Sequence, residues 1–340
     1  MRPFDQLPWP AQQRRFRWLA LDALRPYPLQ IQQVKLFSYD TNLLYRVRTM
    51  GGESYVLRLA NGRWRSRTNA AGEVQWLDAL AAETTIPVPR IIRTTTGEAI
   101  VTPSAEGAPD GFHALLMSWL PGTLLGKQLT EENLAKMGEL FGRLHQHAGD
   151  WQPPADFPTQ RFDKMIARGE PELLLSDPVS ALYPPGVAAG IAQMCEAVAG
   201  AYAALDPADL RVIHCDLWHD NIKVHRGVLY PFDFEDTIWG YRLHDIAMAM
   251  LDLYEEMDQA RYETLLAAFR TGYERYLPWP EGSLELLQIG RMLWRTNHFA
   301  NHLERYGAEW LAKDAAFNVE VYQRYLKTGK LIPPLRTPRS

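Results

Sequence analysis

The pattern of apolar and polar positions predicts a strand-rich first region. Short runs rich in β-branched and aromatic residues indicate strands, and apolar residues at helical spacing indicate helices. The expected helices cover 9–24 and about 70–82, and the expected strands cover 31–37, 43–49, 54–59, 91–93, 99–102 and 113–119. Gly51 and Gly52 join the second strand to the third, which is a hairpin signal.

Beyond Pro121 and Gly122 the pattern becomes mostly helical. The expected helices cover 131–147, 186–205, 244–253, 261–277 and 284–305. One β-rich stretch, 212–234, interrupts them. We therefore expect an α+β protein with a small strand-rich lobe, 1–118, and a larger helical lobe, 119–340. This division and a polar stretch between helices suggest an enzyme with a cleft.

Composition excludes several classes of protein. The 340 residues are 46% hydrophobic, which is enough for a sizeable core, and the 36 Lys+Arg and 40 Asp+Glu give a net charge of −4. That balance provides no basic surface for nucleic acid or an anionic membrane. The two cysteines, Cys195 and Cys215, form no Cys-x-x-Cys pair. Pro3 and Asp5 lie where a signal peptide needs apolar residues, so we expect a cytoplasmic protein.

The stretch 212–236 carries the candidate chemistry. An apolar strand leads into a polar loop with His214, Asp216 and Asn221, and a hairpin turn at 226–227 returns the chain to Asp233. Because a hairpin folds these segments back on each other, Asn221 and Asp233 are expected to converge. A carboxylate and an amide oxygen are hard ligands that suit Mg²⁺. Asp216 would stand beside the metal and accept a proton from an attacking hydroxyl.

This spacing, His-x-Asp-x-x-x-x-Asn followed by Asp-Phe, is that of a kinase catalytic loop. The chain resembles the aminoglycoside phosphotransferase/choline kinase superfamily of kinase-like enzymes over most of residues 30–250. The segments that carry the resemblance are the loop and strand 38–47, the strand 55–59, the helix acid Glu73, the linker 116–122, and the helices around Leu144–His145 and His244–Asp245. The resemblance implies a protein-kinase-like fold with two lobes.

The resemblance also implies roles for single residues. Asp216 would be the catalytic base, and Asn221 and Asp233 would hold magnesium between the phosphates of ATP, with GTP as the alternative nucleotide. His214 is expected to fix the loop by hydrogen bonds. The residues expected to bind the nucleotide are Arg58, Glu73, Ser38, Asn42, Met117 and Trp119.

Two positions depart from the family pattern. Arg58 stands where these enzymes usually have a lysine, and Glu235 stands where a small residue usually follows Asp-Phe. Arginine keeps the charge and can grip a carboxylate with two parallel hydrogen bonds, so an Arg58–Glu73 pair is expected. The alternative for both residues is a solvent-facing position. The sequence contains no Gly-x-x-x-x-Gly-Lys-Ser/Thr motif, which excludes a Walker-type P-loop.

The acceptor site is less well defined by the sequence. Residues 294, 297, 298 and 301 form one helical stripe that suits hydroxyl or amine recognition, although core packing explains such a stripe as well. Glu255, Glu256 and Asp258 could attract a cationic acceptor or form a solvated helix end. The residues assigned to the acceptor are Asp236, Trp239, Glu255, Trp294 and His298.

The sequence therefore predicts an ATP- and Mg²⁺-dependent phosphotransferase that acts on a hydroxyl of a small metabolite or antibiotic, with or without an amine group. No nucleic-acid or membrane partner is expected, and the chain would be a monomer or a homodimer. The alternatives are a non-catalytic nucleotide-binding module, a metal-dependent hydrolase using His214, Asp216 and Asp233, and a protein Ser/Thr kinase of the same fold.

Overall fold

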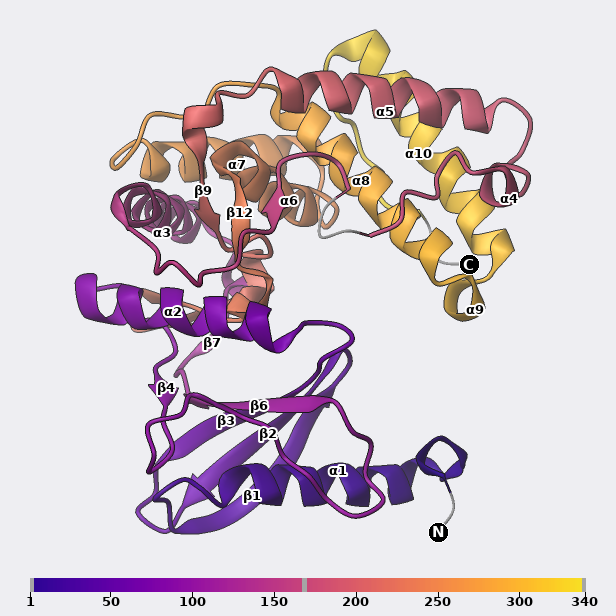
Figure 1. Cartoon of the computed structure of the whole chain (residues 1–340). Helices are drawn as coiled ribbons and strands as arrows, with labels where there is room; N and C mark the ends of the chain where they lie inside the picture. The colour runs from indigo at the N-terminus through magenta and orange to yellow at the C-terminus, as the bar shows by residue number, and fades with distance from the viewer. Residues whose placement is uncertain (1–2, 167–169, 338–340) are drawn as a thin grey trace. The chain divides into compact units, whose positions relative to one another are not determined.

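The computed structural model describes residues 3–166 and 170–337. The chain divides into two compact units, each built from several stretches. The first unit contains residues 1–122, 153–158 and 230–236, and the second contains 123–152, 159–229 and 237–340. The boundary expected at 118/119 stays a prediction, and the two units are described below one at a time (Figure 1).

A mainly antiparallel sheet forms the centre of the first unit. Its strands follow the order β1-β2-β3-β6-β4, and β5 also pairs with β6. The strands are β1 (Ile31–Tyr39), β2 (Asn42–Thr49), β3 (Ser54–Asn61), β4 (Ile91–Ile92), β5 (Ile100–Val101) and β6 (Phe112–Ser118). The β2–β3 hairpin turns at the two glycines expected there, with Arg48 opposite Ser54. The expected strands 91–93 and 99–102 both pair with β6 and not with each other.

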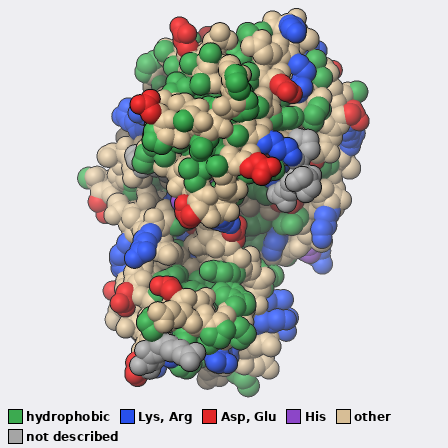
Figure 2. Space-filling view, turned by 90° about the vertical axis from the view of Figure 1, so that its right-hand side faces the viewer, with side chains coloured by type: hydrophobic (Ala, Val, Ile, Leu, Met, Phe, Trp, Pro, Cys, Tyr) green, Lys and Arg blue, Asp and Glu red, His purple; other side chains and the backbone are tan. Residues whose placement is uncertain are grey.

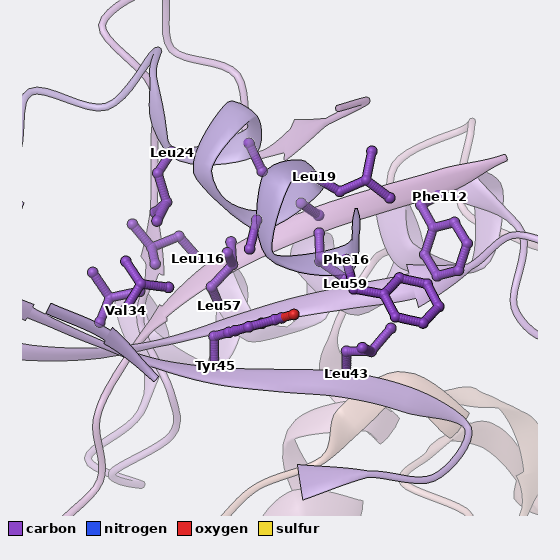
Figure 3. Packing of buried hydrophobic residues seen from close by; sticks show 14 of the residues in the cluster. Phe16, Leu19, Leu24, Val34, Leu43, Tyr45, Leu57, Leu59, Phe112 and Leu116 are labelled. Carbon is purple, nitrogen blue, oxygen red and sulfur yellow. The ribbon is translucent and has the colours of Figure 1, made fainter. Parts of the chain in front are cut away.

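Two helices pack against this sheet through different residues of the same strands. Helix α1 (Trp9–Leu24) joins Leu57, Leu59 and Leu116 in the largest cluster of the unit (Figure 3). Each buried side chain of this size stabilises the fold by roughly 1.5–3 kcal/mol. Helix α2 (Arg67–Glu83) packs instead against Leu115 of β6. Successive strand residues point to opposite faces, so Arg58, between the two leucines of β3, lies on the α2 face.

The segment 230–236 completes the first unit although it is distant in sequence. It ends in a 3₁₀ turn, η5 (Phe234–Asp236), whose fully buried Phe234 ring lies 5.5 Å from that of Trp76 in α2. The N-terminus of α2 is fixed by Ser66, which accepts a hydrogen bond from the Asn69 amide in a reciprocal capping box. Helix α2 and η5 therefore pack together through Trp76 and Phe234.

The second unit is mainly helical. Helix α8 packs against α5, α6 and α10, and α3 packs closely against α7 (Figure 1). The helices are α3 (Glu131–Asp150), α4 (Asp177–Ser180), α5 (Val187–Ala203), α6 (Arg242–Tyr254), α7 (Gln259–Tyr273), α8 (Leu284–Asn301), α9 (Leu303–Tyr306) and α10 (Ala308–Thr328). The expected helix 284–305 is interrupted at His302, whose backbone is not helical. Helix α10 was not expected from the sequence.

Short strands hold the polar loop of the second unit. One sheet has the order β11-β10-β7 and another the order β8-β12-β9. Their strands are β7 (Thr123–Leu124), β8 (Arg161–Phe162), β9 (Leu210–Ile213), β10 (Ile222–His225), β11 (Val228–Pro231) and β12 (Ile238–Tyr241). Between β9 and β10 lies η4 (His219–Asn221), and η1 (Phe4–Gln6), η2 (Leu125–Gln128) and η3 (Pro207–Asp209) are the other described 3₁₀ turns.

The surface agrees with the balanced charge of the sequence. On the face drawn in Figure 2, acidic and basic side chains are both spread among hydrophobic and polar ones. None of the helices in the described ranges has the length and apolar character needed to cross a membrane.

Candidate active site

Asp216 and Asn221 are brought together by the loop between β9 and β10. The Asn221 side-chain amide donates to the Asp216 carbonyl oxygen at 2.8 Å and to its Oδ2 at 3.0 Å. Its own Oδ1 accepts no hydrogen bond from any residue in 3–166 or 170–337. The Asp216 side chain is 29% exposed. The loop thus holds one carboxylate at the surface and leaves an amide oxygen available beside it.

A buried network fixes the backbone that carries Asp216. The preceding residue, Cys215, has φ of 69°, a conformation that costs a non-glycine residue of order 1 kcal/mol. Its N–H donates to Asp245 Oδ1 at 2.7 Å, and Asp245 Oδ2 lies 3.0 Å from His145 Nε2. Burial opposes ionisation, but the hydrogen bond from His145 holds the pKa of Asp245 below its usual value. Helices α3 and α6 thereby clamp the loop.

His214 and Gly126 support the same loop. His214 is fully buried, and its Nδ1 accepts from the Asp216 N–H at 3.4 Å, which agrees with the structural role expected for it. Gly126 in η2 packs directly against η4, because a Cβ at this position would meet the Asp220 carboxylate and the His219 ring. The loop is therefore held by a hydrogen bond to His214 and by close packing against Gly126.

Arg58 and Glu73 form a buried ion pair in the first unit. The side chains are 3% and 1% exposed, so the solvent-facing alternative for both is wrong. Arg58 Nη1 donates to Glu73 Oε1 at 3.1 Å, and Nη2 donates to Oε2, which gives the two-pronged contact that arginine allows. Although burial opposes it, the charges of Glu73 and Glu235 raise the pKa of Arg58 further, so its charge is secure.

Asp233 lies beside this pair with two further acids. Arg58 Nη1 is 3.8 Å from Asp233 Oδ1 and 3.9 Å from Glu235 Oε2. Asn42 Nδ2 donates to Glu235 at 2.6 Å, and Arg65 Nε donates to Asp236 at 2.8 Å. Partial burial of a side chain that stays 40% exposed, together with the Glu235 carboxylate, raises the pKa of Asp233 above its usual value.

The donor chemistry of these residues fits a hard cation. Four carboxylates, Glu73, Asp233, Glu235 and Asp236, lie within 4 Å of two guanidinium groups, Arg58 and Arg65. The excess negative charge on oxygen donors would be offset by a bound divalent ion. Within the described ranges, no group of three or more His, Cys, Asp and Glu could hold a metal ion, so no more than two of these carboxylates could bind the same ion. The hydrolase alternative stays a prediction.

The remaining nucleotide candidates also lie in the first unit. Ser38 is exposed near the end of β1, and Met117 on β6 is paired with both Val56 and Ile91. The Trp119 N–H donates to the Ser54 carbonyl at 3.2 Å, and the Arg46 guanidinium lies 4.3 Å from the Trp119 ring centre. Nucleotide binding by these residues stays a prediction.

Comparison with known proteins identifies the family. The sequence profile described as "Phosphotransferase enzyme family" matches residues 40–279. The chain belongs to this family. Amicoumacin kinase of Bacillus subtilis (strain 168) is 23% identical over 281 residues, which are 78% of this chain and 76% of that protein.

Solved structures of phosphotransferases share the fold. An amicoumacin kinase in complex with AMP-PNP, Ca²⁺ and the compound Ami superposes with a TM-score of 0.73 at 18% identity, covering 96% of this chain and 98% of that one. A microcompartment-associated aminopropanol kinase gives a TM-score of 0.71 at 19% identity, covering 94% and 98%. The predicted α+β, protein-kinase-like fold is therefore confirmed. The chain is an enzyme, a phosphotransferase with an alcohol group as acceptor.

The acceptor residues expected for this phosphotransferase lie on several different elements. Trp239 lies on β12, and Asp236 is paired with Arg65 in the first unit. Glu255 is 4% exposed and paired with Arg295, and Asp258 caps α7 by accepting from the Arg261 amide at 2.9 Å. The acidic patch expected at 255–258 is thus partly committed to structural contacts.

The four residues expected to form one stripe on α8, at 294, 297, 298 and 301, make two different kinds of contact. Asn297 and Asn301 both donate to the Pro171 carbonyl at 3.0 Å, so these two anchor a loop. The Trp294 and His298 rings lie 5.8 Å apart, and Trp294 packs against the cluster that contains Cys215. Trp294 therefore packs against a cluster that includes the residue before Asp216, and its role toward an acceptor stays a prediction.

Sequence reasoning missed one residue at this site. Arg291 in α8 places its Nη2 3.6 Å from Asp216 Oδ1. It lies 75 positions after Asp216, and no motif marked it; its position three residues before Trp294 was the only available signal.

Proposed function

We propose that this phosphotransferase moves the γ-phosphoryl group of ATP to a hydroxyl of a small molecule with a divalent cation, Mg²⁺, as cofactor. The observation that supports this most is the arrangement of Asp216, whose backbone is clamped by Asp245 and whose carboxylate is positioned by Asn221. Such a carboxylate, fixed and partly exposed, suits a base that orients an attacking hydroxyl.

The proposed reaction is a single displacement. The acceptor oxygen forms a bond to the γ-phosphorus, the bond from that phosphorus to the β–γ bridging oxygen breaks, and ADP leaves. Asp216 Oδ1 or Oδ2 takes the hydroxyl proton. Most of the catalysis would come from positioning and from neutralisation of charge.

Asn221 Oδ1 and the Asp233 carboxylate would hold the metal. Both are oxygen donors, as Mg²⁺ requires, and the Asn221 oxygen is not used by any described residue. A bound divalent cation would neutralise phosphate charge during transfer. Arg58, locked by Glu73, would contact the α- and β-phosphates in place of the usual lysine.

Substitution of the proposed base tests the function. Acceptor-stimulated release of ADP should be measured across a panel of hydroxylated compounds with Mg²⁺ present. Asp216→Asn should lower kcat by at least about 10²-fold, the contribution typical of a general base, while ATP still binds. Glu304→Gln, at a carboxylate that is 79% exposed, is the matched control and should keep full activity.

Retained transfer in Asp216→Asn would reject the role of this residue. A thermal shift caused by ATP that does not depend on Mg²⁺, without turnover of any acceptor, would favour a non-catalytic nucleotide-binding module. Transfer of labelled phosphate to proteins and not to small molecules would favour the protein-kinase alternative.

A further inference from the structure

Arg291 of α8 is a shielded cation without a hydrogen-bonding partner. Its side chain is only 13% exposed, and its guanidinium lies 4.4 Å from the Trp294 ring centre. Within residues 3–166 and 170–337 it makes no hydrogen bond, and Asp216 is the one carboxylate within 4.0 Å of it. The Nε atom is sealed from solvent, whereas the two terminal nitrogens are not. The Nη2 atom of Arg291, which is accessible to solvent, therefore lies beside Asp216.

Three other shielded arginines of the same unit are paired with carboxylates at hydrogen-bonding distance. Arg211 donates to Asp209 at 2.9 Å, Arg242 donates to Asp209 at 2.5 Å, and Arg295, one turn after Arg291 in α8, pairs with both Asp252 and Glu255. These side chains are between 12% and 22% exposed, as Arg291 is. The Arg291 Nε–H group, withdrawn from water without a hydrogen bond, carries a desolvation cost. An anion bound to the Arg291 guanidinium would supply the missing hydrogen bonds and the counter-charge.

We propose that Arg291 binds a carboxylate of the acceptor, so that the substrate is a small hydroxylated carboxylic acid. This inference rests on the proposed function, because it takes Asp216 as the group that contacts the acceptor hydroxyl. The 3.6 Å separation between Nη2 and Oδ1 exceeds a hydrogen bond, so Arg291 leaves Oδ1 able to accept the hydroxyl proton. Trp294 beneath the guanidinium fixes its plane for a two-pronged contact with a planar carboxylate.

The geometry also limits the size of the acceptor. With hydrogen bonds of about 2.7–2.9 Å at each end, the hydroxyl and carboxylate oxygens cannot lie more than about 9 Å apart. Angled contacts shorten this separation to roughly 4–7 Å. Two to four carbon atoms between the two groups satisfy that range. A cationic group at the same place would be repelled by Arg291.

Three compounds of equal length test the inference. They are 4-hydroxybutyrate, 4-hydroxybutanamide and 4-amino-1-butanol, which present an anion, a neutral amide and a cation to the same position. The carboxylate should give a kcat/KM about 10- to 100-fold above that of the other two, as expected for a charged hydrogen bond. In Arg291→Met this preference should disappear, mainly through KM. Arg291→Lys should restore part of it, and Arg275→Met, at an arginine that is 60% exposed, should change nothing.

Binding without turnover separates this inference from the proposed function. Saturation-transfer NMR should detect 4-hydroxybutyrate on the wild-type protein and not on Arg291→Met, with circular dichroism confirming that the variant is folded. Carboxylate binding that depends on Arg291, with no phosphorylation of any acceptor, supports the inference and rejects the proposed function. Turnover that ignores the charge of the acceptor rejects the inference alone, as does the absence of carboxylate binding. A uniform loss of kcat for all three compounds in Arg291→Met would show that the arginine acts on the transferred phosphoryl group instead.

Discussion

At the scale of single residues, Arg58 organises the acids of the first unit. It contacts Glu73 through two hydrogen bonds and lies within 4 Å of Asp233 and Glu235. A lysine has one charged nitrogen and could not hold both oxygens of Glu73 while facing the other two carboxylates at once. An arginine at position 58 therefore suits a site that also contains the additional acid Glu235.

Removal of the Arg58 guanidinium should lower the free energy of unfolding. In Arg58→Met, Glu73 would remain buried without its counter-charge, and the free energy of unfolding should fall by about 3–5 kcal/mol. Arg58→Lys keeps the charge and should lose less, about 1–2 kcal/mol. Urea denaturation at pH 7 measures both. Arg93→Met, which breaks a pair with 46% and 44% exposed side chains, should cost no more than about 1 kcal/mol. Equal losses in Arg58→Met and Arg93→Met would contradict this account.

Local spacing was enough to find some residues and not others. Asp216 and Asn221 are five positions apart, and their hydrogen bonds form within one loop, so the sequence pattern carried the information. The position of Arg291 depends on how α8 packs, which involves contacts between residues far apart in the chain. No short pattern encodes such packing, and this residue could be found only in the structure.

At the scale of secondary-structure elements, α3 and α7 approach until their backbones touch. A Cβ at Gly138 would collide with the Phe269 carbonyl, and one at Gly272 would collide with the Ala135 carbonyl. Glycine is required at these positions because the opposing atoms are backbone and cannot rotate away. Since α3 also carries His145, this contact positions one end of the network that clamps the Asp216 loop.

An added methyl group at this contact should separate the two helices. Gly138→Ala should lower the free energy of unfolding by about 2–4 kcal/mol, because overpacking is not relieved by a side-chain rotation. Gly200→Ala in α5 is the matched control: nothing lies within 4 Å of its Cβ, so helix propensity should raise stability by about 0.5–1 kcal/mol. Thermal unfolding of both variants distinguishes the two effects. A Gly138→Ala protein as stable as wild type would show that the helices can move apart freely.

Hydrophobic periodicity predicted most elements but not their partners. Helix α1 was expected over the residues that it occupies, because its apolar side repeats regularly. The pairing of β4 and β5 with β6 could not be read from two-residue strands, since strand order depends on distant segments. Helix α10 buries Leu311, Ala315, Val321 and Tyr322 at helical spacing, but the polar residues Asp314 and Asn318 are buried on the same side and interrupt its apolar pattern.

At the scale of the whole molecule, each unit contains a histidine that resists protonation. Burial, and then the charges of Arg58 and Arg67, lower the pKa of His113 to about 4. Burial likewise lowers the pKa of His298 to about 4, with His302 contributing. An unfolded histidine binds its proton near pH 6.5, so between pH 6.5 and 4 the unfolded chain binds more protons than the folded one. Their contribution to stability is complete above pH 6.5 and is lost as the pH falls toward 4.

Replacement of His113 by a neutral residue should reduce this sensitivity. Between pH 7 and pH 5 the free energy of unfolding of His113→Gln should fall by about 2 kcal/mol less than that of wild type. Urea denaturation at the two pH values measures this difference in the free energy of unfolding. Groups such as Asp233 are present in both proteins, so their contributions to the pH dependence cancel in the comparison. An identical pH dependence in the two proteins would show that His113 is protonated in the folded state.

The discontinuous chain path of the first unit has a consequence for recombination between relatives. A gene fragment that ends at position 122 encodes Arg58 and Trp76 but omits the segment 230–236, which supplies Asp233, Glu235 and the ring of Phe234. A chimera that exchanges only the front half would join one parent's cation to the other parent's anions. A functional exchange of the first unit would therefore have to replace both stretches of the chain together.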